Sequence, residues 1–590
     1  MLLSSPPDSQ TTPTFIEGCL TLIAVGVAFI APRLGSSFFS RVEGAFGRLA
    51  QRRNLAVVVV GVAALLLRLA ILPICPIPVP FVPDDFSFLL AADTFLHGRL
   101  TNVTPAMWIH FETIHVTMQP TYMSMYFPAQ GLVLAAGKVL FGHPWYGLLL
   151  ASALMCASIC WMLQAWLPST WALLGGMIAI VHLGLFSYWI NTYHAAGTIG
   201  ALGGALVLGA LPRLMKTARQ RHGVLMALGI AILVLTRPYE GLLLCVPVAI
   251  VLGRWALFGK NRPAMGVLIR RAAFPVALMV AAIAWLGYYD YQAFGSPTTL
   301  PYTINRATYA MAPYFVWQHQ RPEPAYRHEV MRSFYYIGEL DFFSKIHSLT
   351  GFLPQTLVKA LAVLMFFAGF ALLPPLVMLR RVLMDRRIRF LVIGVLALIA
   401  GMLIQIFIIA HYVAPFTSAL YAIGLQAMRH LRLWSSENKP VGLTLVRLSV
   451  TLCLVMAGLR LFAGPLHLAL PEWPSNNWNA TWYGPDHFGT ERARIESILE
   501  HVPGDQLAIV RYTARHNPME EWVYNSADID GSKVIWARDM DARNNAELIR
   551  FYKNRQIWLV QPDAEPGEVL SPYTIHGQPA SQVSIASASH

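Results

Sequence analysis

The chain has 590 residues, of which 56% are hydrophobic and only 13% are charged, and its formal net charge is +13. Soluble domains carry about a quarter charged residues, so this composition excludes an ordinary soluble protein and indicates a multi-pass membrane protein. Basic residues gather in short connections between apolar runs, which is typical of membrane proteins and requires no nucleic-acid partner. None of the six cysteines follows Pro465, so no disulfide-stapled domain is predicted.

Apolar runs of membrane-spanning length recur along most of the chain. They predict an all-α membrane bundle of about twelve helices, at 15–32, 54–74, 145–165, 169–188, 196–212, 223–237, 240–253, 272–289, 352–379, 389–410, 413–428 and 441–464. The polar head at 1–14 lacks the basic segment of a cleavable signal peptide, and none is predicted.

The lysine and arginine counts predict which connections face the cytoplasm. Half of these residues, 22 of 44, lie in five connections: 33–53, 213–222, 254–271, 380–389 and 429–439. The positive-inside rule makes these five cytoplasmic. The loops near 75–144 and 290–351, together with the tail, are then predicted on the outer side. A bacterial inner membrane with a periplasmic tail is the predicted location, although an endoplasmic reticulum protein would show the same pattern.

The tail at 466–590 is predicted to be a separate soluble unit. Three segments, "QLAIVRY", "KVIWARD" and "QIWLVQP", are typical of short strands, while "RARIESILEHV" and "AELIRFYKN" have helical periodicity. This order predicts a small α/β layer. It lacks a GxGxxG loop, so no nucleotide is assigned to it, and a lid or docking surface is the expected role.

Two adjacent carboxylates, Asp84 and Asp85, begin an amphipathic helix in the stretch "VPDDFSFLLAADTFLHGRL". Capping of the helix explains one of them but not both. A carboxylate at a membrane boundary suits removal of a proton from a hydroxyl that attacks an anomeric carbon. Asp84 and Asp85 are therefore predicted to be catalytic, as a base or as a stabiliser of the transition state. Like-charge proximity is expected to raise one pKa.

This stretch resembles the first outer loop of the GT-C superfamily of glycosyltransferases, which includes the protein O-mannosyltransferases and the bacterial aminoarabinose transferases. Later segments resemble the same enzymes in the same order: "QPTYMSMYFPAQGLVLAAGKVLFGHPW", "YYDYQAFGSP" and "HYVAPFTSALYA". The resemblance covers roughly residues 54–430. It departs from better-known members in having Asp-Asp where many have Asp-Glu, and Gln119-Pro120 where several have His-Pro.

The resemblance implies that 15–465 is the catalytic domain of an integral membrane glycosyltransferase. Such enzymes transfer a sugar from a polyprenyl-phosphate-linked donor to a glycan, lipid or protein acceptor on the outer face, typically with inversion. The departures leave the sugar and the acceptor open. On the chemistry that the resemblance implies, Asp84 is the first choice for the base, with Asp85 supporting it.

A lipid phosphate needs cationic partners on the outer side, where arginine is scarce. Arg237, in "TRPYEG", and Arg306, in "LPYTINRATYA", are the predicted phosphate ligands, because a guanidinium offers a planar fork of donors. Glu240 is an alternative partner that would neutralise Arg237. Aromatic and histidine side chains at other outer span ends are further candidates for substrate contacts: Tyr193, His194, His411 and Tyr412.

The segment "WIHFETIHV" brings His110, Glu112 and His115 close together in sequence. The three side chains are candidate ligands for a divalent metal. Ordinary interfacial or acceptor contacts are the alternative, since the spacing is not HExxH. No other cofactor is predicted.

Two other classes of function stay open. A transporter or lipid flippase would suit the number of spans, but no convincing internal repeat is found and the ionisable residues cluster at the outer edge. A non-catalytic membrane scaffold whose tail binds a partner is the third class.

Overall fold

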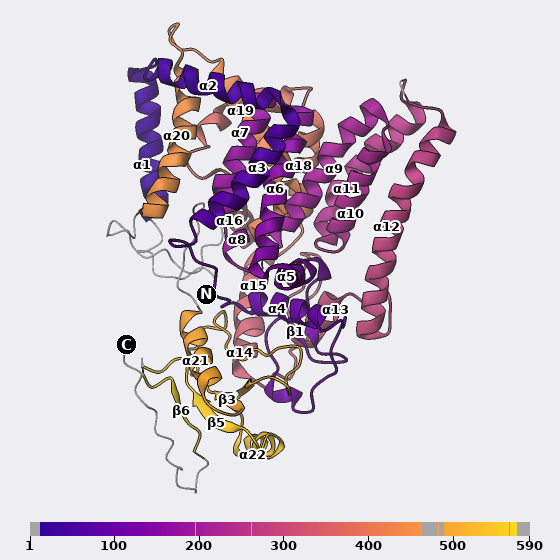
Figure 1. The fold of residues 1–590 in the computed structure, drawn as a ribbon, viewed down its shortest axis with the longest axis vertical. Helices are drawn as coiled ribbons and strands as arrows, with labels where there is room; N and C mark the ends of the chain where they lie inside the picture. The colour runs from indigo at the N-terminus through magenta and orange to yellow at the C-terminus, as the bar shows by residue number, and fades with distance from the viewer. Residues whose placement is uncertain are drawn as a thin grey trace.

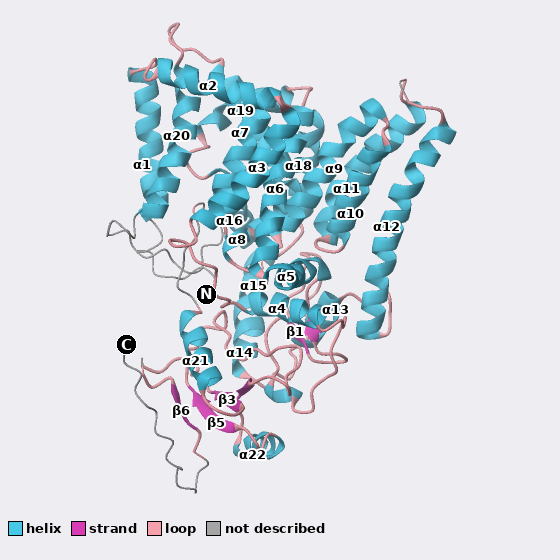
Figure 2. Ribbon diagram, viewed as in Figure 1, coloured by secondary structure: helices cyan, strands magenta, loops and turns pink. Residues whose placement is uncertain are grey.

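The computed structural model describes residues 12–194, 196–260, 262–462, 482, 489–565 and 567–574. These residues are mainly helical, and the strands lie at one end of the molecule (Figure 2). Most of the polar head lies outside the described residues. The predicted fold class, a helical membrane bundle with a small C-terminal α/β unit, is confirmed.

Seven described helices are long and apolar enough to cross a membrane: α3 (Arg53–Ala70), α6 (Trp145–Trp166), α9 (Gly197–Thr217), α11 (Pro238–Phe258), α12 (Met265–Phe294), α16 (Leu349–Ala368) and α20 (Val441–Phe462). Shorter apolar helices are α1 (Thr12–Ile30), α5 (Pro128–Phe141), α7 (Ser169–Ala179), α10 (Gln220–Val234) and α18 (Arg389–Leu403). The run predicted at 413–428 forms η5 (Ala410–Phe416) and α19 (Thr417–Arg432). Helix α19 is more polar than the other helices of the bundle, because its last turn carries three basic residues.

The connections contain shorter elements. The helices among them are α2 (Ser36–Gln51), α4 (Pro83–Leu96), α8 (Tyr188–Asn191), α13 (Pro301–Tyr309), α14 (Glu329–Arg332), α15 (Leu340–His347) and α17 (Leu379–Met384). Two short 3-10 helices are η1 (Trp108–His110) and η4 (Pro374–Met378), and two π-helical turns are η2 (Ile180–Leu185) and η3 (Ser333–Glu339).

The two ends of the bundle differ in charge and in structure. Helix α2 and the connection between α19 and α20 lie at one end (Figure 1), and they belong to the segments 33–53 and 429–439 that the lysine and arginine counts predict to be cytoplasmic. Helix α4 and the C-terminal sheet lie at the opposite end (Figure 1). The arrangement is consistent with a chain whose connections alternate between a basic side and a side poor in cations.

Helix α4 starts where the sequence provides helix-start signals. Val82 is extended, Pro83 occupies the first helical position, and both aspartates lie in the first turn. Proline needs no hydrogen-bond partner there, and negative charge is favourable at the positive end of the helix dipole. The helix runs beside α5, where a Cβ at Gly131 would lie 2.7 Å from the Cβ of Ala91. Glycine at 131 is therefore required for the close approach.

The C-terminal sheet has the strand order β4-β3-β5-β6. Strand β3 (Gln506–Val510) pairs in parallel with both β4 (Val534–Arg538) and β5 (Gln556–Val560), and β6 (Leu570–Pro572) pairs antiparallel to β5. Helices α21 (Thr490–His501) and α22 (Ala542–Phe551) complete the unit. We refer to residues 489–574 as the C-terminal sheet unit.

This unit shares a hydrophobic core with the first outer loop. Leu507, Ile509 and Ile535 from the sheet form one buried cluster with Phe86 and Leu90 of α4. The other side of the sheet packs against α21 in a second cluster. The tail was predicted as a separate unit, whereas one face of its sheet supports the helix that carries Asp84.

Candidate active site

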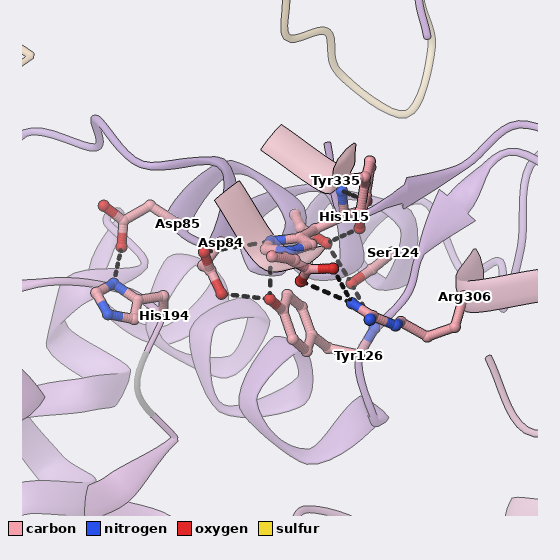
Figure 3. A network of polar contacts seen from close by, with 10 residues as sticks. Asp84, Asp85, His115, Ser124, Tyr126, His194, Arg306 and Tyr335 are labelled. Atoms are coloured by element: carbon pink, nitrogen blue, oxygen red, sulfur yellow. Dashed lines mark hydrogen bonds and ion pairs between the residues drawn. The ribbon is translucent and has the colours of Figure 1, made fainter. Parts of the chain in front are cut away.

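Asp84 lies at the centre of a polar network at the sheet end of the bundle (Figure 3). Its Oδ1 accepts a hydrogen bond from the hydroxyl of Tyr126, and its Oδ2 lies 3.2 Å from Nδ1 of His115. The Tyr126 hydroxyl and His115 Nδ1 are 3.0 Å apart, so the three groups close a triangle. The Asp84 side chain keeps 20% of its surface exposed, which leaves it accessible to a small reactant.

His115 is held in an unusual backbone conformation. Its φ is 63°, in the left-handed region that non-glycine residues seldom adopt. The Ser87 hydroxyl donates to the His115 carbonyl at 2.7 Å, and the Met125 N–H donates to the same oxygen at 3.2 Å. The His115 N–H donates to the Tyr335 hydroxyl at 3.4 Å. Local strain that the surroundings maintain in this way is a frequent property of functional sites.

Asp85 points away from Asp84 and is fully buried (Figure 3). Its Oδ1 accepts hydrogen bonds from the Tyr193 N–H at 2.8 Å and from Nδ1 of His194 at 3.0 Å. Its Oδ2 accepts a third from the Phe81 N–H at 3.3 Å. These contacts indicate a structural role for Asp85: it connects the start of α4 to the segment that follows α8.

The Asp84 carboxyl does not have the raised pKa that like-charge proximity predicts for the base. Burial alone would raise the pKa of Asp84, but the charge and hydrogen bond of His115, the nearby His194 and the Tyr126 hydroxyl together lower that pKa below its usual range. Burial and the Asp84 carboxylate raise the pKa of Tyr126 well above its usual value. Asp84 is therefore an ionised carboxylate beside a neutral phenol. Such a group can accept a hydrogen bond from an attacking hydroxyl and stabilise positive charge that develops on a sugar.

Several other predicted residues lie on the bundle side of Asp84. The Arg237 guanidinium lies 4.5 Å from the centre of the Tyr412 ring, and Glu240 is buried one turn later in α11. Burial raises the pKa of Tyr412 to about 12; Arg237 opposes this shift, and Glu240 and Asp84 add to it. The structure thus places Arg237 against the Tyr412 ring, with Glu240 three residues later in the chain. His411 Nδ1 lies 2.9 Å from the Tyr188 hydroxyl in the same region.

Arg306 does not have the surroundings of a phosphate ligand. Its Nη1 donates to both carboxylate oxygens of Glu339 at 2.7 Å, and its Nη2 donates to the Ala312 carbonyl at 2.5 Å. Glu339 is the last residue of the π-helical turn η3, which lies in the same outer loop, near 290–351, as Arg306. Because the Arg306–Glu339 pair is buried, its main effect is to hold this loop together.

The three predicted metal ligands do not converge. His110 Nδ1 faces the Arg538 carbonyl at 3.3 Å, Glu112 accepts hydrogen bonds from Arg327 and Tyr309, and His115 faces Asp84. Across the described ranges, no group of three His, Cys, Asp or Glu side chains is arranged to hold a metal ion. In the structure, His110, Glu112 and His115 therefore do not form one metal site.

The main residue that sequence reasoning missed is Tyr126. It lies within the quoted "QPTYMSMYFP" segment, but no spacing rule connects it to Asp84, 42 positions earlier. Tyr335 and Ser87, which fix the His115 backbone, were missed for the same reason.

No family model and no curated protein matches the chain. Among solved structures, it is similar to the Archaeoglobus fulgidus oligosaccharyltransferase tethered with an acceptor peptide, at 11% identity and a TM-score of 0.42, over 85% of this chain and 68% of that one. It is similar to the archaeal oligosaccharyltransferase AglB from Archaeoglobus fulgidus in complex with an inhibitory peptide and a dolichol-phosphate, at 10% identity and a TM-score of 0.43, over 86% of this chain and 69% of that one. It is also similar to ArnT from Cupriavidus metallidurans bound to undecaprenyl phosphate, at 14% identity and a TM-score of 0.41, over 86% of this chain and 93% of that one.

Proposed function

We propose that the protein is an integral membrane glycosyltransferase that moves a sugar from a polyprenyl-phosphate-linked donor to an acceptor hydroxyl on the outer face of the membrane. The observation that carries this proposal is the Asp84 carboxylate. It is partly accessible, its neighbours lower its pKa, and helix α4, which carries it, lies at the end of the bundle opposite the basic segments 33–53 and 429–439.

In the proposed reaction the acceptor hydroxyl donates a hydrogen bond to Asp84. The acceptor oxygen attacks the anomeric carbon from the side opposite the phosphate, and the bond between that carbon and the phosphate oxygen breaks. The bonding electrons leave with the polyprenyl phosphate, and the hydroxyl proton passes to Asp84. Because the attack is in line, the anomeric configuration inverts. Arg237 is the proposed partner of the leaving phosphate.

An apolar cavity within the helical bundle supports a lipid-linked donor. Its volume is about 530 Å³, and side chains of α16, α18 and α19 line it together with Val413 of η5, the residue after Tyr412. Lys359, the cationic residue in its lining, donates to the Gln405 carbonyl at 3.2 Å. A cavity of this size and polarity is suited to several isoprenoid units of a polyprenyl chain.

The function is tested with the purified full chain in liposomes, supplied with undecaprenyl-phosphate sugars that carry a tritiated hexose or pentose. Candidate lipid, peptide and glycan acceptors are added outside. The proposal predicts covalent label on one class of acceptor and an equal amount of released undecaprenyl phosphate. Movement of intact donor across the bilayer without covalent transfer would instead identify a flippase and contradict the proposal.

Arg237→Gln is expected to raise the KM for the donor by about tenfold to a hundredfold, because a charge-assisted hydrogen bond contributes about 1.5–3 kcal/mol. The KM for the acceptor should stay near the wild-type value. Initial rates at varied donor concentration provide the measurement. Arg332→Gln is the matched control, since Arg332 forms exposed ion pairs with Glu323 and Glu329. Equal donor KM values in the two variants would argue against a phosphate contact for Arg237.

His115→Gln is expected to move the acid limb of the pH profile to higher pH. The base works while ionised, and His115 is the main group that keeps the pKa of Asp84 below 3.8. Without it, burial raises that pKa, so activity is lost earlier as the pH falls. The measurement is kcat/KM between pH 4 and 8. His97→Gln, at the exposed end of α4, should leave the limb in place. An unshifted limb in His115→Gln would show that His115 does not control Asp84.

A further inference from the structure

The C-terminal sheet unit contacts α4 directly beside the proposed base. Phe86 follows Asp84 by two residues, and its ring stacks on the Tyr524 ring with the centres 4.5 Å apart. The Tyr524 hydroxyl donates to the Phe86 carbonyl, and the Arg492 guanidinium lies 4.7 Å from the centre of the Phe86 ring. One side chain of α4 is therefore enclosed by two side chains of the distant C-terminal unit.

The same C-terminal segment follows α4 toward its other end. The Ala527 N–H donates to Oδ2 of Asp93 at 2.7 Å. The Tyr122 hydroxyl, from the first outer loop, donates to the Asn525 carbonyl at 3.0 Å. Contacts at the first turn and near the last turn constrain both the position and the direction of the helix.

This segment is itself fixed to the sheet. Arg492 of α21 donates to the Trp522 carbonyl at 3.1 Å and to the Tyr524 carbonyl at 3.3 Å. The Asn525 side chain accepts from the Trp536 N–H at 2.9 Å and donates to the Trp536 carbonyl at 2.8 Å. The contact surface for α4 is thus an extension of strand β4.

A second contact reaches the His115 side of the network. Arg538, the last residue of β4, donates from Nε to the Glu112 carbonyl at 2.6 Å. Its Nη2 donates to the Glu521 carboxylate at 2.6 Å, and both side chains are buried. Because Glu112 precedes His115 by three residues, one rigid unit contacts the two chain segments whose side chains meet at the Asp84–His115 pair.

We propose that the C-terminal sheet unit positions Asp84 against His115, with Tyr524 as a positioning residue for the transfer reaction. This inference rests on the proposed function of Asp84. Tyr524 touches no reacting atom; it acts by fixing Phe86, and through it the first turn of α4. A small displacement of a reacting group lowers the turnover rate far more than it weakens substrate binding.

The test compares Tyr524→Phe with Tyr552→Phe in the full chain. Each variant loses one hydroxyl of the same unit, but the Tyr552 hydroxyl bonds to Asp530 and not to α4. Tyr524→Phe is expected to lower kcat by about tenfold or more, with both KM values within about twofold of wild type. Tyr552→Phe should keep the wild-type kcat. Equal kcat values in the two variants would overturn the proposal.

A second variant and a second measurement guard against a general folding defect. Tyr122→Phe removes the contact with Asn525 from the first outer loop and should lower kcat in the same way. Hydrogen exchange of the α4 peptide, which needs no substrate, should be faster in Tyr524→Phe and Tyr122→Phe than in Tyr552→Phe. Unchanged exchange of α4 would overturn the positioning role. An inactive wild type with this exchange pattern would refute the proposed function and leave the contact with α4 established.

Discussion

Asp84→Asn is expected to lower the rate of sugar transfer by about a hundredfold to ten-thousandfold, the usual contribution of a general base. The amide keeps an oxygen that can accept the hydrogen bond from Tyr126, so the fold should persist. It cannot take a proton from the acceptor hydroxyl, and it no longer carries the negative charge next to His115. The measurement is the initial rate of label transfer from a saturating undecaprenyl-phosphate sugar.

Asp341→Asn is the matched control, because Asp341 is an exposed aspartate paired with Lys345. It should transfer sugar at the wild-type rate. A variant Asp84→Asn that keeps more than about a tenth of the wild-type rate would remove the mechanism, since general-base catalysis accounts for larger effects.

Asp85→Ala is expected to destabilise the protein by about 3 kcal/mol or more, because three buried donors lose their acceptor. The N–H groups of Tyr193 and Phe81 and the imidazole of His194 would lose their acceptor inside the protein. Unmade hydrogen bonds of buried donors carry the full desolvation cost. Thermal unfolding in detergent, followed by size-exclusion chromatography, measures the loss of folded protein.

Asp85→Asn, which keeps an acceptor oxygen, should recover part of the lost stability. The pair of variants also separates the two aspartates by role. If Asp85→Ala unfolded at the wild-type temperature but transferred no sugar, Asp85 would have to take part in the chemistry, and its structural assignment would be wrong.

The bundle and the strands were predictable because their signals are local. Apolar runs and alternating strand patterns lie within a few residues of one another, and the predicted segment "QLAIVRY" contains β3. The support of α4 by the sheet was not predictable in this way. Phe86 and Tyr524 are separated by 438 positions, and nothing in either segment specifies the other.

The site shows the same division between local and distant information. A charged pair at the start of a helix was enough to single out Asp84 and Asp85, but their opposite orientations depend on partners from other segments. His110, Glu112 and His115 were grouped because they are neighbours in sequence, yet each contacts a different partner. Arg306 was chosen for its charge, and its carboxylate partner lies 33 positions away.

The shared core under α4 has a consequence for biosynthesis. Leu507, Ile509 and Ile535 are translated only after the last apolar helix, α20, has been made. A nascent chain can therefore have all of its hydrophobic segments in the bilayer while its first outer loop still lacks support. On the proposed mechanism, catalysis would begin only once the C-terminal sheet has been synthesised, and a premature stop codon beyond α20 would abolish activity without disturbing membrane insertion.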